Sequence, residues 1–533
     1  MKELREIKFE DLTVEQKISM VTCAQFDPWN RDPSADEFIY DKIRDRSLGC
    51  VWVYPTTSDY KDIMKKIHEI ADYPILIFTD AENGMGHSGT GGHNTIGMAD
   101  SEELAYEFGK VTAITARNMG YNVVCNPLMD MVKGASIASG NRRSMGSNKY
   151  RVAALAAAIA RGMHDGGVLT VGKHYPSAEK TDGRPIDSHM AEAYSPVEKE
   201  ELIDYCLYPY LELMKEDLLD GVMTSHTRIP NIDPDYPASL SKKVIGIIRE
   251  LGFDGFAITD GLSMMGIVAK FGDSDSKGLA IEQGNDIALV GGRNYEKMYN
   301  MVYDCYKKGI LSLERLDEAT KHVLAAQHKV FEMQPKFTEV TEEDIQAMET
   351  LSKNAVFAKT DDGKAPTVSR DGRHLFIVMA DIDDQLNEKQ LPIDTFTQRW
   401  YEPSYFVERF NELFPNSEVA VVKEFPTANV IQRTLRKAVD FEDVVYVTVT
   451  HGRAYGGREE FAPPFISLIE AMQVSDQVSA IVHFGSPYAL EPLPHIPTII
   501  YSTSSRRGVD AALDVLAGNY PAKGTLTYDV KFE

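Results

Sequence analysis

Seven short apolar runs, separated by segments with helical periodicity, fill residues 1 to about 335 and constrain the fold most strongly. Each run is continuously apolar rather than alternating, which is typical of strands buried on both faces, as in parallel sheets. Between two of them, segment 149–164 carries apolar residues at three- and four-residue steps until Gly166-Gly167 ends the pattern. The runs occupy 49–54, 74–80, 122–131, 168–176, 221–226, 253–260 and 285–292.

This repetition of strand and helix predicts an α/β protein whose residues 1–338 form a (β/α)8 TIM-type barrel with one irregular unit. A doubly wound open sheet is the structural alternative. Segment 334–341 contains Pro335 and no periodicity, so we expect a domain boundary there. Residues 339–533 begin with a helical pattern and predict a smaller parallel-sheet domain. Its apolar runs occupy 374–381, 417–424, 443–451, 478–487 and 498–504.

The charge balance and the cysteines limit the partners and the compartment. The net charge of 56 − 80 = −24 argues against a polyanion such as nucleic acid as a partner. The five cysteines form no CxxC pair and are odd in number, which argues against a disulfide framework or a zinc site. The N-terminus is charged where a signal peptide is apolar, and no run is long enough to span a bilayer. We therefore expect a cytoplasmic protein without a membrane partner, unless a signal has been removed.

Polar residues follow almost every run of the predicted barrel. In a barrel, the carboxyl ends of all strands meet at one mouth, where active sites are built. For each residue alone, the alternative is a helix N-cap, because Asp and Ser are good caps. The residues are Asp80, Asp130, Lys173, His174, Ser225, His226 and Asp260.

Two of these features suit a catalytic role. Asp260 ends an apolar run, and a carboxylate shielded from water can act as a nucleophile toward an electrophilic carbon. His189 lies in a polar loop two residues after Asp187, a spacing that lets the carboxylate orient the imidazole as an acid or base. An N-cap at Asp260 and a solvent-exposed loop histidine are the alternatives.

Four further residues suit the binding of a sugar. Lys173 and His174 are adjacent and would face opposite sides of a regular strand, so both reach a ligand only where the strand ends or is broken by Pro176. A salt bridge within the barrel mouth is a compatible alternative for Lys173. Asp80 and Arg143 can anchor sugar hydroxyls through a carboxylate and a guanidinium.

Together these motifs resemble glycoside hydrolase family 3, and within it the bacterial β-N-acetylglucosaminidase branch, over nearly the whole chain. The resemblance implies a TIM-type barrel followed by an α/β sandwich domain. The similar segments are LTVEQKI (12–18), TDAENG (79–84), RRSMG (142–146), KHYP (173–176), PASLS (237–241), LGFDG (251–255), FGSPYAL (484–490) and 511–526.

The resemblance assigns roles residue by residue. Asp260 occupies the position of the family nucleophile, and the Asp187–His189 pair replaces the carboxylic acid/base of other family members. The remaining residues implied to bind substrate are Asp80, Arg143, Lys173 and His174. The chain departs from the branch after Pro176, where it lacks the usual glycine and the loop is about three residues longer.

The resemblance implies retaining hydrolysis of a terminal β-linked N-acetylglucosamine through a glycosyl-Asp intermediate, with no metal or other cofactor. Three alternatives stay open. A neutral histidine base does not repel an anion, so phosphate could replace water and make the chain a phosphorylase. A β-glucosidase of the same family and a non-catalytic sugar-binding protein are the others. The leaving group of the natural substrate (a muropeptide, a chitin fragment or another glycan) is left open.

Overall fold

The computed structural model describes residues 4–26, 33–57, 59–131, 143–178, 188–291, 294–380, 403–450 and 460–532. Its contacts divide the chain into two compact units. Unit 1 comprises Met1–Ser88, Glu102–Met131 and Asn148–Ile345. Unit 2 comprises Gly89–Ser101, Val132–Ser147 and Gln346–Glu533.

Unit 1 is a barrel of eight parallel strands in the order β10-β1-β2-β3-β4-β5-β7-β9. The ring closes between its first and last strands, where the Thr259 N–H donates to the Ile287 carbonyl at 3.0 Å. The predicted barrel is thus confirmed, and the open sheet is wrong. The strands are β1 (Thr22–Gln25), β2 (Cys50–Trp52), β3 (Leu76–Thr79), β4 (Val123–Val124), β5 (Leu169–Tyr175), β7 (Gly221–Thr224), β9 (Phe256–Thr259) and β10 (Ala288–Leu289).

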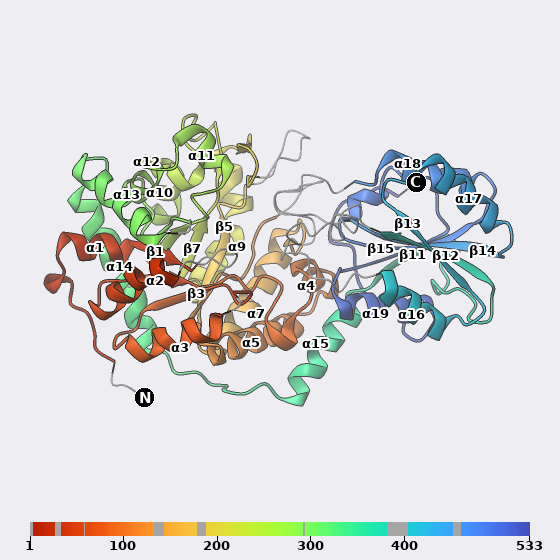
Figure 1. Cartoon of the computed structure of the whole chain (residues 1–533), viewed down its shortest axis with the longest axis horizontal. Coiled ribbons are helices and arrows are strands. Elements are labelled where there is room, and N and C mark those ends of the chain that lie inside the picture. Colours follow the sequence, from red (N-terminus) through yellow and green to blue (C-terminus); the bar gives the residue numbers. More distant parts are fainter. Residues whose placement is uncertain are drawn as a thin grey trace. The chain divides into compact units, whose positions relative to one another are not determined.

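Helices surround these strands in unit 1 (Figure 1). The helix predicted over 149–164 is α7, and it ends where Gly167 adopts a left-handed conformation with φ of 87°. The helices are α1 (Val14–Val21), α2 (Pro33–Arg44), α3 (Tyr60–Ile70), α5 (Glu102–Asn118), α7 (Lys149–Gly166), α8 (Lys199–Glu201), α9 (Tyr208–Lys215), α10 (Lys242–Glu250), α11 (Met265–Phe271), α12 (Asp275–Glu282), α13 (Tyr295–Lys307) and α14 (Leu313–Glu332). A separate short pair, β6 (Ala193–Tyr194) and β8 (Thr227–Arg228), lies outside the barrel sheet.

One barrel strand, β1, is absent from the seven predicted runs. Its sequence TCAQ is too short and too polar to give an apolar pattern, although Thr22, Cys23 and Ala24 are fully buried. The barrel interior is filled by large side chains, including Trp52, which stacks on Phe78 with ring centroids 6.0 Å apart. The interior is therefore a packed core, and any site must lie at its mouth.

Unit 2 is built on a six-stranded sheet in the order β11-β16-β15-β14-β12-β13, in which only β11 runs antiparallel to its neighbour. Figure 1 shows α17 and α18 on one face of the sheet and α16 and α19 on the other. The predicted α/β sandwich is confirmed. The strands are β11 (Phe357–Thr360), β12 (His374–Ala380), β13 (Glu418–Lys423), β14 (Asp443–Val449), β15 (Val478–Phe484) and β16 (Thr498–Ser502). The helices are α4 (His93–Ala99), α15 (Glu342–Asn354), α16 (Pro403–Leu413), α17 (Ala428–Ala438), α18 (Pro463–Gln473) and α19 (Arg506–Leu516), with α15 crossing the division at Ile345.

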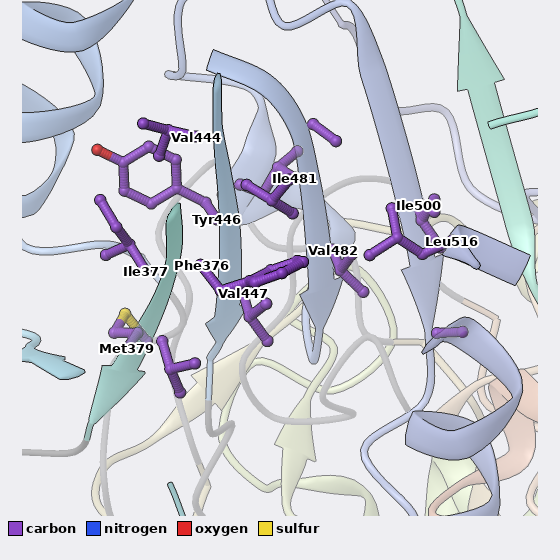
Figure 2. Close-up of a cluster of buried hydrophobic side chains, with 14 of the residues drawn as sticks. Phe376, Ile377, Met379, Val444, Tyr446, Val447, Ile481, Val482, Ile500 and Leu516 are labelled. Carbon is purple, nitrogen blue, oxygen red and sulfur yellow. The ribbon is translucent and has the colours of Figure 1, made fainter. Parts of the chain in front are cut away.

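The core of unit 2 lies on both faces of this sheet (Figure 2). Side chains alternate between the faces of a strand, so Val444 and Tyr446 lie on one side of β14 and Val447 on the other. All three are completely buried, which explains the continuous apolar runs in the sequence. Strand β11 escaped prediction because it lies at the sheet edge and is only partly buried.

No helix in the described part of the chain combines the length and the apolarity that a membrane crossing requires.

Candidate active site

The predicted site residues of unit 1 gather at one rim of the barrel, because its strands are parallel. Asp80 follows β3, Lys173 and His174 lie within β5, and Asp260 follows β9. Asp260 is not a helix cap, since the N-cap of α11 is Met264. This rim is the carboxyl-terminal end of the barrel, where enzymes with this fold carry their active sites.

Lys173 is held between two carboxylates. Its side chain is 1% exposed, and its Nζ donates to Asp80 Oδ1 and Glu82 Oε1, each at 2.6 Å. The salt bridge considered as an alternative is therefore present. The Asp80 side chain remains 46% exposed, so its carboxylate can also accept hydrogen bonds from a ligand. Sequence reasoning missed Glu82, although it lies two residues after Asp80 in the TDAENG motif.

His174 is fixed by Asp130, which follows β4. Asp130 Oδ2 lies 2.7 Å from His174 Nδ1, and Asp130 Oδ1 accepts from the His174 backbone N–H at 2.9 Å. Because an ionised carboxylate only accepts, Nδ1 carries the hydrogen and the ring orientation is set. The pairing of β5 with β7 shifts register between Lys173 and Tyr175. This irregularity lets two adjacent side chains reach the same rim.

Asp260 is half-buried, and its Oδ1 accepts a hydrogen bond from the Gly261 N–H at 2.7 Å. Burial is the largest single influence and raises the pKa of this carboxyl. Three nearby imidazoles and the Gly261 N–H outweigh it and lower the pKa of Asp260 to about 2. The imidazoles belong to His174, His226 and His189. Asp260 is therefore ionised at neutral pH, as a nucleophile requires.

His226 is a buried residue of the rim that sequence reasoning placed at a strand end without giving it a role. Its Nε2 donates to the Gly261 carbonyl at 3.0 Å, because a carbonyl can only accept. Its Nδ1 then accepts from the Ser239 hydroxyl at 2.7 Å. Burial lowers the pKa of His226 below its ordinary value, so the ring is neutral near pH 7. His226 thus holds the residue that follows Asp260.

His189 lies in a turn that contacts the start of α11. The backbone N–H groups of Met265 and Gly266 donate to the carbonyls of His189 and Ser188, at 3.2 and 3.0 Å. The half-buried His189 also acts electrostatically on Asp260. Asp187 lies outside the described residues, so its pairing with His189 stays a prediction.

The structure does not bring every predicted residue into this group. Arg143 belongs by its contacts to unit 2, so its role in substrate binding also stays a prediction. Among the described residues, no cluster of three or more His, Cys, Asp and Glu side chains is arranged to hold a metal ion. The rim thus offers an ionised carboxylate, an imidazole on a neighbouring turn, and a second carboxylate able to bind hydroxyl groups.

Residues 13–326 match the model of the glycosyl hydrolase family 3 N terminal domain, and the chain belongs to this family. It is therefore a glycoside hydrolase, and the resemblance seen in the sequence is confirmed. The matched segment contains the whole set of residues at the barrel rim.

Individual proteins extend the comparison. A β-hexosaminidase of Hydrogenovibrio crunogenus is 29% identical over 252 residues, which are 44% of this chain and 69% of the relative. The structure of a glycoside hydrolase family 3 β-N-acetylglucosaminidase from Paenibacillus sp. str. FPU-7 superposes with a TM-score of 0.81 at 24% identity, covering 98% of this chain and 100% of the other. A β-glucoside phosphorylase, BglX, superposes with a TM-score of 0.79 at 20% identity, covering 98% and 95%. At these identities the two structures establish the two-part fold alone.

Proposed function

We propose that the chain is a retaining exo-β-N-acetylglucosaminidase, which releases a terminal β-linked N-acetylglucosamine from a glycan. The observation that carries the proposal is the ionised Asp260 at the end of β9, with His189 on a turn against the helix that follows. The β-hexosaminidase relative supports the choice of sugar.

In the first half of the proposed reaction, Asp260 attacks the anomeric carbon. The bond from this carbon to the leaving-group oxygen breaks, and His189 gives that oxygen a proton. A glycosyl ester of Asp260 results. In this proposal Lys173, His174 and Asp80 hold the sugar from the same rim. The family resemblance adds two expected roles, substrate binding by Arg143 and orientation of His189 by Asp187.

In the second half, the now neutral His189 takes a proton from water, whose oxygen attacks the anomeric carbon. The ester bond breaks and returns Asp260 as a carboxylate. Two inversions at one carbon retain the β configuration of the sugar.

The test compares nitrophenol release from the aryl β-N-acetylglucosaminide and the aryl β-glucoside, using the wild type and Asp260→Ala. We expect a strong preference for the N-acetyl substrate, lost in the variant. A preference for the glucoside would make the chain a β-glucosidase. Binding of N-acetylglucosamine without any turnover would make it a sugar-binding protein.

A second candidate is phosphorolysis, favoured by the use of an imidazole at the acid/base position. A deprotonated His189 is uncharged, so it repels an incoming phosphate less than a carboxylate base would. Phosphate would then replace water and yield N-acetylglucosamine 1-phosphate. Initial rates with and without phosphate, together with product identification, separate this candidate from hydrolysis.

A further inference from the structure

The turn that carries His189 completes the start of α11. The first four N–H groups of a helix have no partner within the helix. In α11 the N-cap Met264 supplies no side-chain acceptor, and two of the first N–H groups instead donate to the carbonyls of Ser188 and His189. The helix that follows the nucleophile strand therefore binds the backbone of the acid/base turn directly.

Gly266 makes this close approach possible. A Cβ atom at this position would lie 2.7 Å from the Ser188 carbonyl oxygen and 3.0 Å from that of Ala191. Contacts this short do not persist, so a side chain would push the turn away from the helix. Gly266 lies within α11 and its φ is not in the left-handed region, so the requirement is for space alone.

The chain that leaves the turn is also fixed to the rim. Strand β6 pairs with β8, which follows β7, and the Ser195 N–H donates to the Arg228 carbonyl at 2.8 Å. Glu192 Oε1 lies 2.7 Å from Arg228 Nε and 3.4 Å from Nζ of Lys270, a residue of α11. The segment that carries His189 is therefore held at two places, by hydrogen bonds to α11 and by the pairing of β6 with β8 beside β7.

We infer that the first turn of α11 sets the distance between the acid/base and the nucleophile, and that Gly266 is a positioning residue for His189. The inference rests on the proposed function. Asp260 and Met265 are joined by only four residues, so one short connection carries both the nucleophile and the N–H groups that hold the turn. A shift of about 1 Å in such a geometry can cost roughly 100-fold in rate.

Gly266→Ala tests the inference through its dependence on the leaving group. General acid catalysis matters most where the departing oxygen is strongly basic, and contributes little where it is already stable as an anion. We expect kcat/KM to fall roughly 30- to 100-fold for alkyl or sugar leaving groups, and by less than about 3-fold for dinitrophenol. The matched control is Gly246→Ala in α10, where nothing lies within 4 Å of the added Cβ and both rates should stay at the wild-type level.

Met265→Pro is a second variant that removes the N–H donated to His189 without adding a side chain at 266. Proline is favoured at the first position of a helix, and the preceding Met264 has ψ of 144°, which proline accepts. The control is Leu313→Pro at the first position of α14, after Ser312 with ψ of 153°. The same selective loss on poor leaving groups is expected at 265 and not at 313.

The outcomes separate the inference from the function on which it rests. Equal losses on good and poor leaving groups in folded variants, or no loss on either, would overturn the role of Gly266 while Asp260→Ala remained inactive. An active Asp260→Ala would instead overturn the proposed function. If Gly266→Ala does not fold by circular dichroism, Met265→Pro decides the matter alone.

Discussion

The amino-terminal and carboxyl-terminal rims of the barrel both carry Asp together with His and a basic side chain. The two rims use these residue types for different purposes. At the amino-terminal rim, the carboxylates of Asp220 and Asp286 are each surrounded by several donors from the protein. At the carboxyl-terminal rim, Asp260 accepts one hydrogen bond from the described residues, that of Gly261. A His–Asp contact alone therefore does not mark a catalytic site. What distinguishes Asp260 is an ionised carboxylate that is half-buried at the carboxyl-terminal rim and still has unused acceptor capacity.

Asp220, directly before β7, is a carboxylate whose acceptor capacity is used by donors from the protein. It accepts from His164 Nε2 at 2.7 Å, from the Thr170 N–H at 2.9 Å and from Lys329 Nζ at 2.8 Å. Its side chain is 2% exposed. These partners lie on α7, β5 and α14, so one carboxylate joins three elements of the barrel.

Asp286, before β10, likewise joins several elements at a neighbouring part of the amino-terminal rim. It accepts from Arg249 at 2.6 Å, from Arg315 at 2.8 Å and from the Ala257 N–H at 2.8 Å. His322 Nδ1 lies 2.8 Å from Asp286 Oδ1, the oxygen that also accepts from Arg315. No acceptor capacity is left for a substrate, so this group is structural.

The largest expected effect at the catalytic rim is that of Asp260→Asn. It removes the nucleophile and should lower kcat by roughly 10⁴-fold or more, while the protein stays folded. Turnover of the aryl β-N-acetylglucosaminide, with circular dichroism as the control for folding, measures both. Residual turnover within about 100-fold of the wild type would contradict the assignment of the two rims.

Asp286→Asn should give the converse result. It leaves Arg249 and Arg315 partly buried without their anion, which costs roughly 3 to 5 kcal/mol in the free energy of unfolding. Turnover of the remaining folded protein should stay close to wild type. Denaturant unfolding followed together with activity measures both quantities.

The control for Asp286→Asn is Asp304→Asn, which breaks an exposed pair with Lys307 and should leave the free energy of unfolding nearly unchanged. A large loss of turnover in folded Asp286→Asn would contradict a purely structural role for the amino-terminal rim.

The sequence predicts the barrel because burial on both faces makes strands continuously apolar. It does not predict β1, whose residues TCAQ are buried without being strongly apolar. The contacts of the amino-terminal rim could not be predicted either, since Lys329 and Asp220 are 109 residues apart and no local pattern relates them. Contacts of this kind depend on the closed barrel rather than on either segment.

The candidate site was found in part because it follows strand ends, which the sequence does reveal. Asp80, Lys173, His174 and Asp260 were placed at one mouth on this ground. The contacts of Glu82 with Lys173 and of Asp130 with His174 were not, because each joins residues far apart in the sequence that only the closed barrel brings together. The role of His226 depends on a backbone carbonyl, which no sequence motif records.

Asp130→Asn tests whether the His174–Asp130 pair at the carboxyl-terminal rim contributes to substrate binding. The carboxylate that orients His174 loses its charge, and we expect kcat/KM to fall roughly 10- to 100-fold, largely through KM. The matched variant is Asp220→Asn, which alters the His164 pair at the other rim and should leave KM unchanged. Steady-state kinetics on both folded variants decide this, and equal changes in KM would remove the distinction between the pairs.

The smallest effect expected is the pH dependence of stability through Asp220. Burial raises the pKa of this carboxyl, but His164 and Lys329 outweigh it and lower the pKa to about 2 from 3.8. A lowered pKa means that the contribution to stability is complete above about pH 4 and is lost as the pH falls toward 2; it amounts to about 2 kcal/mol. Asp220→Asn should therefore be less stable than the wild type at pH 6, and the difference should vanish near pH 2. Denaturant midpoints of both proteins measured across this pH range test the expectation. A stability difference that is constant with pH would show that the Asp220 charge does not stabilise the amino-terminal rim.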